Sequence, residues 1–503
     1  MTLNKRHVLN RGAGILMPIS AIPSQYGIGT LGKEGFRFVD FLKQIGCSYW
    51  QVLPVGTTSY GDSPYQSFSA FAGNPYFIDL ELLVKEKLLM SEEIAGLNWQ
   101  EKEDCVDYAK LYQLRFMVLR KAFARSKHTT TKQYKLFCKN NKDWLKDYAL
   151  FMAVKNHFDD KEWLLWEQDI KNREREAVER YTILFEEEIR FWEFCQFKFR
   201  EQWDDLKAYA NQSDIQIIGD IPLYVSGDSV DVWAHGEFFD LDHRKNPLRV
   251  AGVPPDAFSE TGQRWGNPLY LWEVMERDNY SWWRKRMQLS GELYDVIRID
   301  HFIGIVNYYS IPTDSEVAME GSWQIGPGSK LTDVIEEAIG SAKIIAEDLG
   351  VVTEKVRDLI NKNGYPCMKV LGFGLEGPSS HEYLPHNYKD TNIIAYTGTH
   401  DNETLVGFFN NKTEEELEFA YKYFHVNKRK DLSYAIIRAL YSSVADVVII
   451  PIQDLLKLDN TARMNSPSTI GGNWNWRMKK SQYNQFNKKV LKEYAEIYSR
   501  LPN

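Results

Sequence analysis

Three acidic residues stand at or just beyond the ends of short apolar runs, where their carboxylates could act together. Asp300 and Glu347 each end such a run, and Asp401 follows a third run at residues 392–396. Short runs rich in β-branched residues indicate buried parallel strands, and the C-terminal ends of such strands form the rim that carries the chemistry of barrel enzymes. Three carboxylates on one rim suit the breaking and making of glycosidic bonds.

Asp300 has the surroundings that a nucleophilic carboxylate needs. On a strand, Arg298 and Asp300 share a face, whereas Ile299 points away. A guanidinium beside a carboxylate favours the ionised form, and an ionised, partly desolvated aspartate can attack the anomeric carbon of a sugar. The alternative is a structural ion pair that closes a layer of the barrel interior.

Glu347 and Asp401 indicate two further roles. Glu347 can serve as general acid and base if burial and a neighbouring carboxylate raise its pKa. The alternative for Glu347 is to cap the next helix, a role for which Asp348 is the better candidate. His400 and Asp401 can hydrogen-bond sugar hydroxyls through contacts that strengthen as the oxocarbenium ion forms, although a lone histidine is more often structural.

Parallel strands must hold these carboxylates together, and the sequence predicts eight such strands. The expected strands are residues 14–20, 49–54, 215–221, 295–300, 343–348, 368–373, 392–396 and 446–451. Helical patterns lie between several of these strands, at residues 33–45, 330–338 and 353–361. This alternation predicts an α/β fold, a (β/α)8 TIM barrel with large, mainly helical insertions between its strands.

Two long segments interrupt the alternation. Residues 80–204 show few strand signals and long helical ones, and we expect them to form a helical insertion subdomain. Residues 1–79 and 205–503 would then form the catalytic barrel. Within it, residues 222–290 are rich in Gly, Pro, Asp and aromatic residues, which predicts an active-site loop excursion over the rim. A stripe at helical spacing marks one helix of the insertion: Phe185, Ile189, Trp192, Phe199 and Trp203.

Composition narrows the classes of function. The chain of 503 residues has a formal net charge of −8 and no basic block, which argues against nucleic acid as its main partner. Its five cysteines form neither a disulfide framework nor a zinc pattern, so we expect free thiols in a reducing cytoplasm. The basic N-terminal residues have the pattern of neither a signal peptide nor a membrane span. The aromatic content of 14% supplies flat rings that either fill the core or stack on sugars.

Longer motifs surround these residues from near the N-terminus to near the C-terminus. They are QVLPVGTTSYGDSPYQSFSAFAGNPYFIDL, GDIPLYVSGDSVDVWAH, GVPPDAFSETGQRWGNPLY, IRIDHFIG, IIAEDLGVV, TGTHDNET and ARMNSPSTIGGNWNWR. Through them the chain resembles the 4-α-glucanotransferases of glycoside hydrolase family 77, the amylomaltases or disproportionating enzymes of the α-amylase superfamily. Two positions depart from the family pattern: Ser468 stands where a glycine is expected, and Glu403 stands where many relatives have aspartate.

The resemblance implies a role for each matching position. Asp300 is implied to be the nucleophile, Glu347 the acid/base and Asp401 the transition-state stabiliser. Tyr60 is implied to border the sugar at the cleavage point, and Asp220 to lie at the barrel floor near the site. The complete set of implied substrate-binding residues is Tyr60, Asp220, Asp256, Gln263, Trp265, Arg298, His400 and Asn465.

The implied reaction moves a segment of an α-1,4-glucan to the 4-hydroxyl of glucose or another α-1,4-glucan by retaining double displacement. Its partners are α-1,4-glucans, maltooligosaccharides and glucose from starch, glycogen or maltodextrin metabolism. We further expect a monomer or homodimer that binds no nucleic acid or membrane. No metal or organic cofactor is expected, because this chemistry needs none and the sequence shows no obvious cluster of metal ligands. Two alternatives stay open. The first is a retaining α-glucan hydrolase, because no residue type shows whether water or a sugar reacts with the covalent intermediate. The second is a non-catalytic glucan-binding protein, although the intact set of three carboxylates argues against it.

Overall fold

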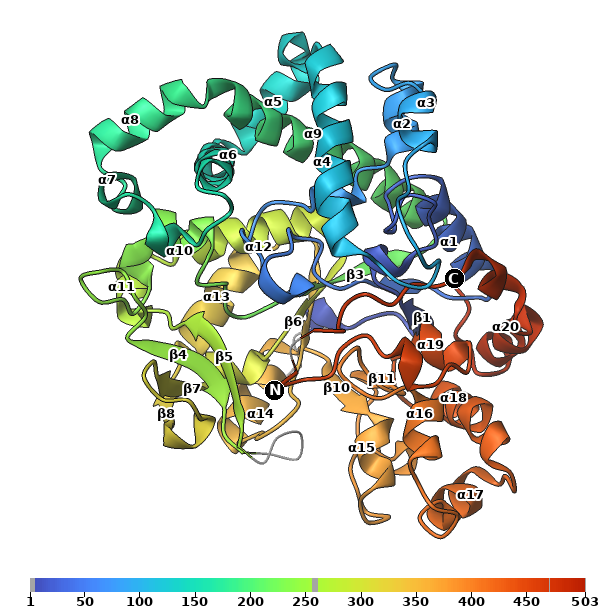
Figure 1. The fold of residues 1–503 in the computed structure, drawn as a ribbon. Coiled ribbons are helices and arrows are strands. Elements are labelled where there is room, and N and C mark those ends of the chain that lie inside the picture. The colour runs from blue at the N-terminus through green and yellow to red at the C-terminus, as the bar shows by residue number, and fades with distance from the viewer. Residues whose placement is uncertain (1–4, 256–260, 470, 503) are drawn as a thin grey trace.

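The computed structural model describes residues 5–255, 261–469 and 471–502, and its centre is a closed barrel of eight parallel strands (Figure 1). The strands are β1 (Gly12–Leu16), β2 (Tyr49–Gln51), β3 (Gln216–Ile221), β6 (Val296–Ile299), β9 (Lys343–Ala346), β10 (Cys367–Val370), β11 (Ile393–Tyr396) and β12 (Val447–Pro451). They follow chain order around the barrel, and β1 pairs with β12 to close it. The predicted (β/α)8 barrel is confirmed.

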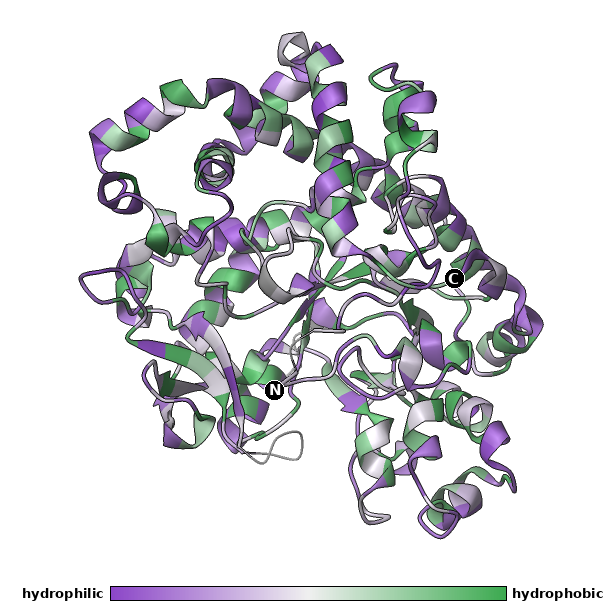
Figure 2. Cartoon of the chain, viewed as in Figure 1, coloured by the Kyte–Doolittle hydropathy of each residue, from purple (hydrophilic) through white to green (hydrophobic). Residues whose placement is uncertain are grey.

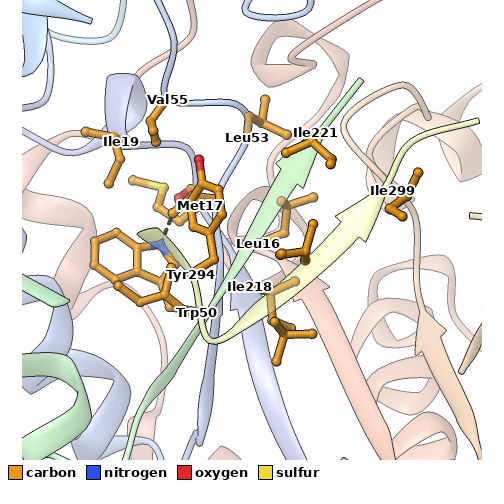
Figure 3. Close-up of a cluster of buried hydrophobic side chains, with 14 of the residues drawn as sticks. Leu16, Met17, Ile19, Trp50, Leu53, Val55, Ile218, Ile221, Tyr294 and Ile299 are labelled. Atoms are coloured by element: carbon orange, nitrogen blue, oxygen red, sulfur yellow. Dashed lines mark hydrogen bonds between the residues drawn. The ribbon is translucent and has the colours of Figure 1, made fainter. Parts of the chain in front are cut away.

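The barrel strands carry the apolar core of the molecule. Strands β1, β6, β11 and β12 are buried along their whole length, as parallel strands are when helices cover them outside and side chains fill the interior. Figure 2 shows these strands mainly green and the surrounding helices banded in purple and green. The cluster of Figure 3 includes Leu16, Ile218 and Ile299 together with Trp50, whose Nε1 donates to the Met17 carbonyl oxygen at 2.8 Å.

Several predicted strands end earlier in the structure than expected, by three residues or more at the first, second and sixth. The first is expected at residues 14–20, but β1 ends at Leu16 because Pro18 cannot donate a ladder hydrogen bond and a 3-10 turn follows at Ile19–Ala21. The second is expected at residues 49–54, but β2 ends at Gln51. The sixth is expected at residues 368–373, but β10 ends at Val370 and helix α15 (Leu371–Leu375) begins directly after it. A short apolar run has the same periodicity in a strand and in a helix, which explains the wrong boundary at β10.

Helices follow the barrel strands and cover the barrel from outside. They include α1 (Lys33–Gln44), α12 (Ser281–Leu293), α13 (Ser329–Ala338), α14 (Glu354–Asn363), α16 (Leu405–Asn410), α17 (Glu418–Phe424), α18 (Leu432–Ser442), α19 (Ile452–Leu455) and α20 (Lys488–Ile497). The helices predicted at residues 33–45, 330–338 and 353–361 correspond to α1, α13 and α14. None of the helices in the described residues combines the length and apolar character that crossing a lipid bilayer requires.

A group of helices lies between β2 and β3 in the chain and at the top of Figure 1. Its members are α2 (Leu80–Lys85), α3 (Glu92–Ala95), α4 (Tyr108–Arg125), α5 (Lys132–Asn140), α6 (Lys142–His157), α7 (Gln168–Lys171), α8 (Arg175–Leu184) and α9 (Glu186–Gln212). Helix α9 carries the predicted stripe, with Trp192, Phe199 and Trp203 buried on one face.

The segment 222–290 contains more regular structure than the predicted loop excursion. It includes α10 (Val230–Ala234), β4 (Arg249–Val253), β5 (Gln263–Pro268), α11 (Trp272–Arg277) and the first part of α12. Strands β4 and β5 join β7 (Asn307–Pro312) and β8 (Ser322–Ile325) in an antiparallel sheet of order β5-β4-β7-β8, seen at the lower left of Figure 1. The expectation of a loop was wrong here because these short strands pair with residues after β6, which local sequence does not reveal.

Arg500 binds the C-terminal segment to the place where β1 and β12 pair and close the barrel. Its guanidinium is fully buried and donates to the carbonyl oxygens of Tyr441, Gly12, Asp446, Ser443 and Ala445 at 2.7–3.1 Å. Gly12 begins β1 and Asp446 directly precedes β12. One side chain therefore satisfies five backbone acceptors at the junction of the first and last strands.

Replacing Arg500 by methionine is expected to lower the free energy of unfolding by at least about 3 kcal/mol, because several buried carbonyl groups lose a charged donor. Guanidinium-induced unfolding measures this loss. The matched control is Arg438→Met, because Arg438 is exposed and its Nε donates only to the Tyr498 hydroxyl in the described contacts, at 3.1 Å. Equal losses for the two variants would contradict the role of Arg500.

Candidate active site

The first two carboxylates follow neighbouring strands at the same level of the barrel. Asp300 comes directly after β6 and Glu347 directly after β9. The preceding residues, Ile299 and Ala346, are partners in the ladder, and the Glu347 amide donates to the Ile299 carbonyl oxygen at 3.1 Å. Adjacent strands are about 4.8 Å apart, so the two carboxylates begin from neighbouring points of the rim.

Asp300 lies against Arg298, as the strand alternation predicts. Arg298 Nη1 donates to Asp300 Oδ1 at 3.0 Å and to the two carboxylate oxygens of Asp220 at 2.7 and 2.6 Å. Asp220 lies on β3 directly opposite Arg298 and is 1% exposed, whereas the Asp300 side chain is 29% exposed. The buried Asp220 thus fixes the guanidinium, and the guanidinium stabilises the negative charge of the accessible Asp300.

Glu347 is held by backbone donors in a dry environment. The amides of His301 and Leu349 donate to its Oε2 and Oε1, each at 2.7 Å, and the residue is only 6% exposed. Burial raises the pKa of Glu347 to about 8; the charge of Arg298 lowers it and the charge of Asp300 raises it. The predicted rise in pKa is confirmed, and this carboxyl group is mostly protonated at neutral pH.

Asp348 caps no helix. Its Oδ1 accepts a hydrogen bond from the Met368 amide at 2.9 Å, whereas Thr353 occupies the N-cap position of α14. Because Met368 lies on β10, Asp348 connects the end of β9 to the next strand of the barrel. Asp348 therefore bonds to β10, whereas Glu347 bonds to the amides of His301 and Leu349.

Asp401 and His400 form a third group beyond β11. Asn465 Nδ2 donates to Asp401 Oδ1 at 2.6 Å, and His400 Nε2 lies 3.3 Å from Asp401 Oδ2. The Asp401 side chain is 38% exposed, so its carboxylate is partly accessible to a ligand. The backbone N–H of Asn465 also donates to the His400 carbonyl oxygen at 3.1 Å, which holds the segment around Asn465 against the segment after β11.

Tyr65 connects these groups and was missed by the sequence reasoning. Its hydroxyl donates to Asp220 Oδ2 at 2.9 Å, and its ring stacks on the His400 imidazole with centroids 5.1 Å apart. Tyr65 belongs to the same SYGDSPYQ motif as Tyr60, so the motif carries the signal for both tyrosines. Tyr60 begins a short 3-10 turn, and its side chain lies outside the described part of the structure.

Strand β5 brings Gln263 and Trp265 to the other side of the site. Trp265 Nε1 donates to Gln263 Oε1 at 3.2 Å, and the indole meets the His301 imidazole edge-on with centroids 4.8 Å apart. His301, a second residue that the sequence reasoning did not single out, directly follows Asp300, and burial lowers its pKa to about 4. Asp256, the remaining predicted residue, lies outside the described residues.

Replacing Tyr65 by alanine is expected to lower kcat/KM about 30-fold or more, because the site loses both the ring beside His400 and a partner of Asp220. Tyr65→Phe keeps the ring and is expected to lose about tenfold or less. Initial rates on maltooligosaccharides measure both effects. Equal losses in the two variants would mean that only the hydroxyl group matters.

Across residues 5–255, 261–469 and 471–502, no group of three or more His, Cys, Asp or Glu side chains is arranged to hold a metal ion.

The chain is similar to known proteins over nearly its whole length. The family model described as 4-alpha-glucanotransferase, Glyco_hydro_77, matches residues 17–483. A 4-alpha-glucanotransferase of Clostridium butyricum is 45% identical over 96% of this chain and 100% of its own, and one of Thermus thermophilus is 42% identical over 98% and 100%. The amylomaltase of Streptococcus agalactiae, solved in complex with acarbose, superposes with a TM-score of 0.94 at 43% identity, over 97% of this chain and 99% of that one. The chain belongs to glycoside hydrolase family 77, the 4-alpha-glucanotransferase family.

Proposed function

We propose that Asp300, Glu347 and Asp401 carry out the 4-alpha-glucanotransferase reaction of this chain, which moves α-1,4-glucan segments with retention of configuration. The observation that supports this division of roles is the contrast between two neighbouring carboxyl groups. Asp300 is accessible and paired with Arg298, whereas burial raises the pKa of Glu347 to about 8. An accessible carboxylate paired with a guanidinium suits a nucleophile, and a buried carboxyl group with a raised pKa suits a general acid.

In the first half-reaction, Asp300 attacks C1 of a glucose unit while Glu347 gives its proton to the departing 4-oxygen. The glucan on the reducing side leaves with that proton, and an ester joins C1 to Asp300. Neighbouring strands about 4.8 Å apart suit the roughly 5–5.5 Å carboxyl separation of retaining enzymes. Asp401 and His400 hold hydroxyls of the reacting sugar, whose contacts strengthen as positive charge develops.

The ester prepares the second half-reaction. Because the charge of Asp300 raises the pKa of Glu347, esterification removes that influence and the pKa of Glu347 falls. Glu347 can then accept the proton of an acceptor 4-hydroxyl, whose oxygen attacks C1 and displaces Asp300. The two steps exchange one α-1,4 bond for another and return both carboxyl groups to their starting states.

The reaction rate is expected to fall at alkaline pH. Glu347 must carry its proton when glycosylation begins, and its pKa is raised to about 8, so kcat/KM for maltotriose should decline about tenfold per pH unit well above pH 8. Initial rates between pH 6 and 10 give this profile. A profile that stays flat to pH 10 would contradict the acid role of Glu347.

Incubation with maltotriose tests the transfer reaction itself. Transfer yields glucose together with a series of longer maltodextrins. Hydrolysis yields only shorter sugars, and a glucan-binding protein without activity leaves maltotriose unchanged although it binds. Chromatography of the products over time distinguishes the three outcomes, and only the first supports the proposal.

We also propose a cytoplasmic setting and a monomeric or homodimeric state. All five cysteines are unpaired in the structure, which suits a reducing compartment. Expected partners are α-1,4-glucans, maltooligosaccharides and glucose, without nucleic acid or membrane. Sedimentation of the purified protein at several concentrations tests the assembly, and a larger oligomer would contradict it.

A further inference from the structure

Two side-chain amides join three segments that surround the site. Gln66 Nε2 donates to Asn267 Oδ1 at 3.1 Å and also lies 3.4 Å from the Trp265 carbonyl oxygen. Asn267 Nδ2 donates to the Val225 carbonyl oxygen at 2.7 Å, and Asn267 is 5% exposed. The loop after β2, the segment after β3 and strand β5 thus meet at one amide pair, in which Asn267 is buried and Gln66 partly buried.

Each amide adjoins one of the aromatic rings of the site. Gln66 directly follows Tyr65, which stacks on His400 beside Asp401. Asn267 lies two residues after Trp265, which packs against His301 beside Asp300. The amide pair therefore links the segment that carries Tyr65 to the segment that carries Trp265. Tyr65 contacts the neighbour of Asp401, and Trp265 contacts the neighbour of Asp300.

We propose that the Gln66–Asn267 pair is a positioning device that fixes the spacing of Tyr65 and Trp265, and that this spacing favours a sugar acceptor over water. The inference rests on the proposed function, in which the glucosyl ester of Asp300 is shared between these two acceptors. A sugar must be held with its 4-hydroxyl aimed at C1, whereas water needs no such alignment. Loss of alignment therefore penalises transfer more than hydrolysis.

Among the described residues, the side-chain hydrogen bonds between β5 and the loop after β2 all involve Gln66 or Asn267. Gln263 and Trp265 are only partly buried, Arg264 and Gly266 are exposed, and Gly266 has a φ of 80° that lets the strand bend between Trp265 and Asn267. Gln66 contacts both the side chain of Asn267 and the backbone of Trp265. Removing either amide would free β5 to move relative to Tyr65 without touching a catalytic carboxylate.

The test compares four variants: Gln66→Ala, Asn267→Ala, Gln66→Asn, and the exchange of Gln66→Asn with Asn267→Gln. Each single substitution is expected to raise the ratio of hydrolysis to transfer about tenfold, with a similar rise in KM for glucose as acceptor. The exchange keeps the combined length of the two side chains and is expected to return the raised ratio of Gln66→Asn most of the way to the wild-type value. Free glucose release and maltodextrin formation from maltotriose are measured together.

The control variant is Gln202→Ala, which removes another buried amide that binds the amide and carbonyl groups of Asp79 at 2.6 and 3.2 Å, outside the site. It should lower the melting temperature and leave the ratio unchanged. The inference would be overturned if Gln66→Ala and Asn267→Ala kept the wild-type ratio of hydrolysis to transfer and the wild-type acceptor KM. It would also be overturned if the exchange variant kept the raised ratio of Gln66→Asn. Failure of the proposed function would look different, since the wild-type protein itself would then form no longer maltodextrins.

Discussion

Asp300→Asn is expected to lower kcat/KM for maltotriose disproportionation by at least about 10⁴-fold, because an amide oxygen cannot form the glycosyl ester. The substitution is isosteric and leaves a neutral acceptor for Arg298 Nη1, which now lies 3.0 Å from Asp300 Oδ1. Binding of maltooligosaccharides should therefore persist. Stopped assays on purified protein, with calorimetric titration of the ligand, separate the loss of chemistry from the loss of binding.

The smaller variant Asp300→Gly provides a second reading of the same role. It opens space below C1 where an added azide ion can attack an activated glucosyl donor directly. One displacement replaces two, so the product should be a glycosyl azide of inverted configuration. Retained disproportionation in Asp300→Asn, or no azide product in Asp300→Gly, would remove Asp300 from the position of nucleophile.

Glu347→Gln is expected to have an effect that depends on the leaving group. With maltotriose, the departing oxygen needs a proton, and kcat/KM should fall about 10²- to 10⁴-fold. With an α-maltosyl fluoride, fluoride departs with little acid assistance, so the first half-reaction should continue and the glycosyl-enzyme should accumulate. Similar losses with both donors would mean that Glu347 acts mainly in folding or binding.

The same variant should gain stability at alkaline pH. The pKa of Glu347 is raised in the folded state to about 8, so the folded protein loses stability as pH rises from the ordinary range of a glutamate through about 8. Glutamine carries no charge and avoids this loss. The melting temperature of Glu347→Gln should therefore exceed that of the wild type more at pH 9 than at pH 5, and a difference independent of pH would contradict the raised pKa.

The sequence revealed the fold and the rim carboxylates because both depend on short-range patterns. A residue that directly follows a buried parallel strand must lie at the rim, which places Asp300 and Glu347 without knowledge of any contact. Side-chain alternation likewise placed Arg298 beside Asp300, and their contact at 3.0 Å confirms it. These features need only the period of a strand and the position where it ends.

Features that depend on pairing between distant segments were not visible. Asp220 meets Arg298 because β3 and β6 are neighbours, although the whole segment with β4, β5 and α12 separates them in sequence. The antiparallel sheet of β4, β5, β7 and β8 forms across β6 in the same way, so residues 222–290 appeared as a loop. The position of Tyr65 has the same cause, since only the folded loop shows that its ring stacks on His400.

The most direct test of the account is to trap the glycosyl-enzyme and locate the bond. Glu347→Gln is mixed with α-maltosyl fluoride, quenched with acid, digested with protease and analysed by mass spectrometry. The account predicts a maltosyl adduct on the peptide that contains Asp300, with fragments that place it on that carboxylate. An adduct on another residue, or none while fluoride is released with inversion at C1, would contradict double displacement through Asp300.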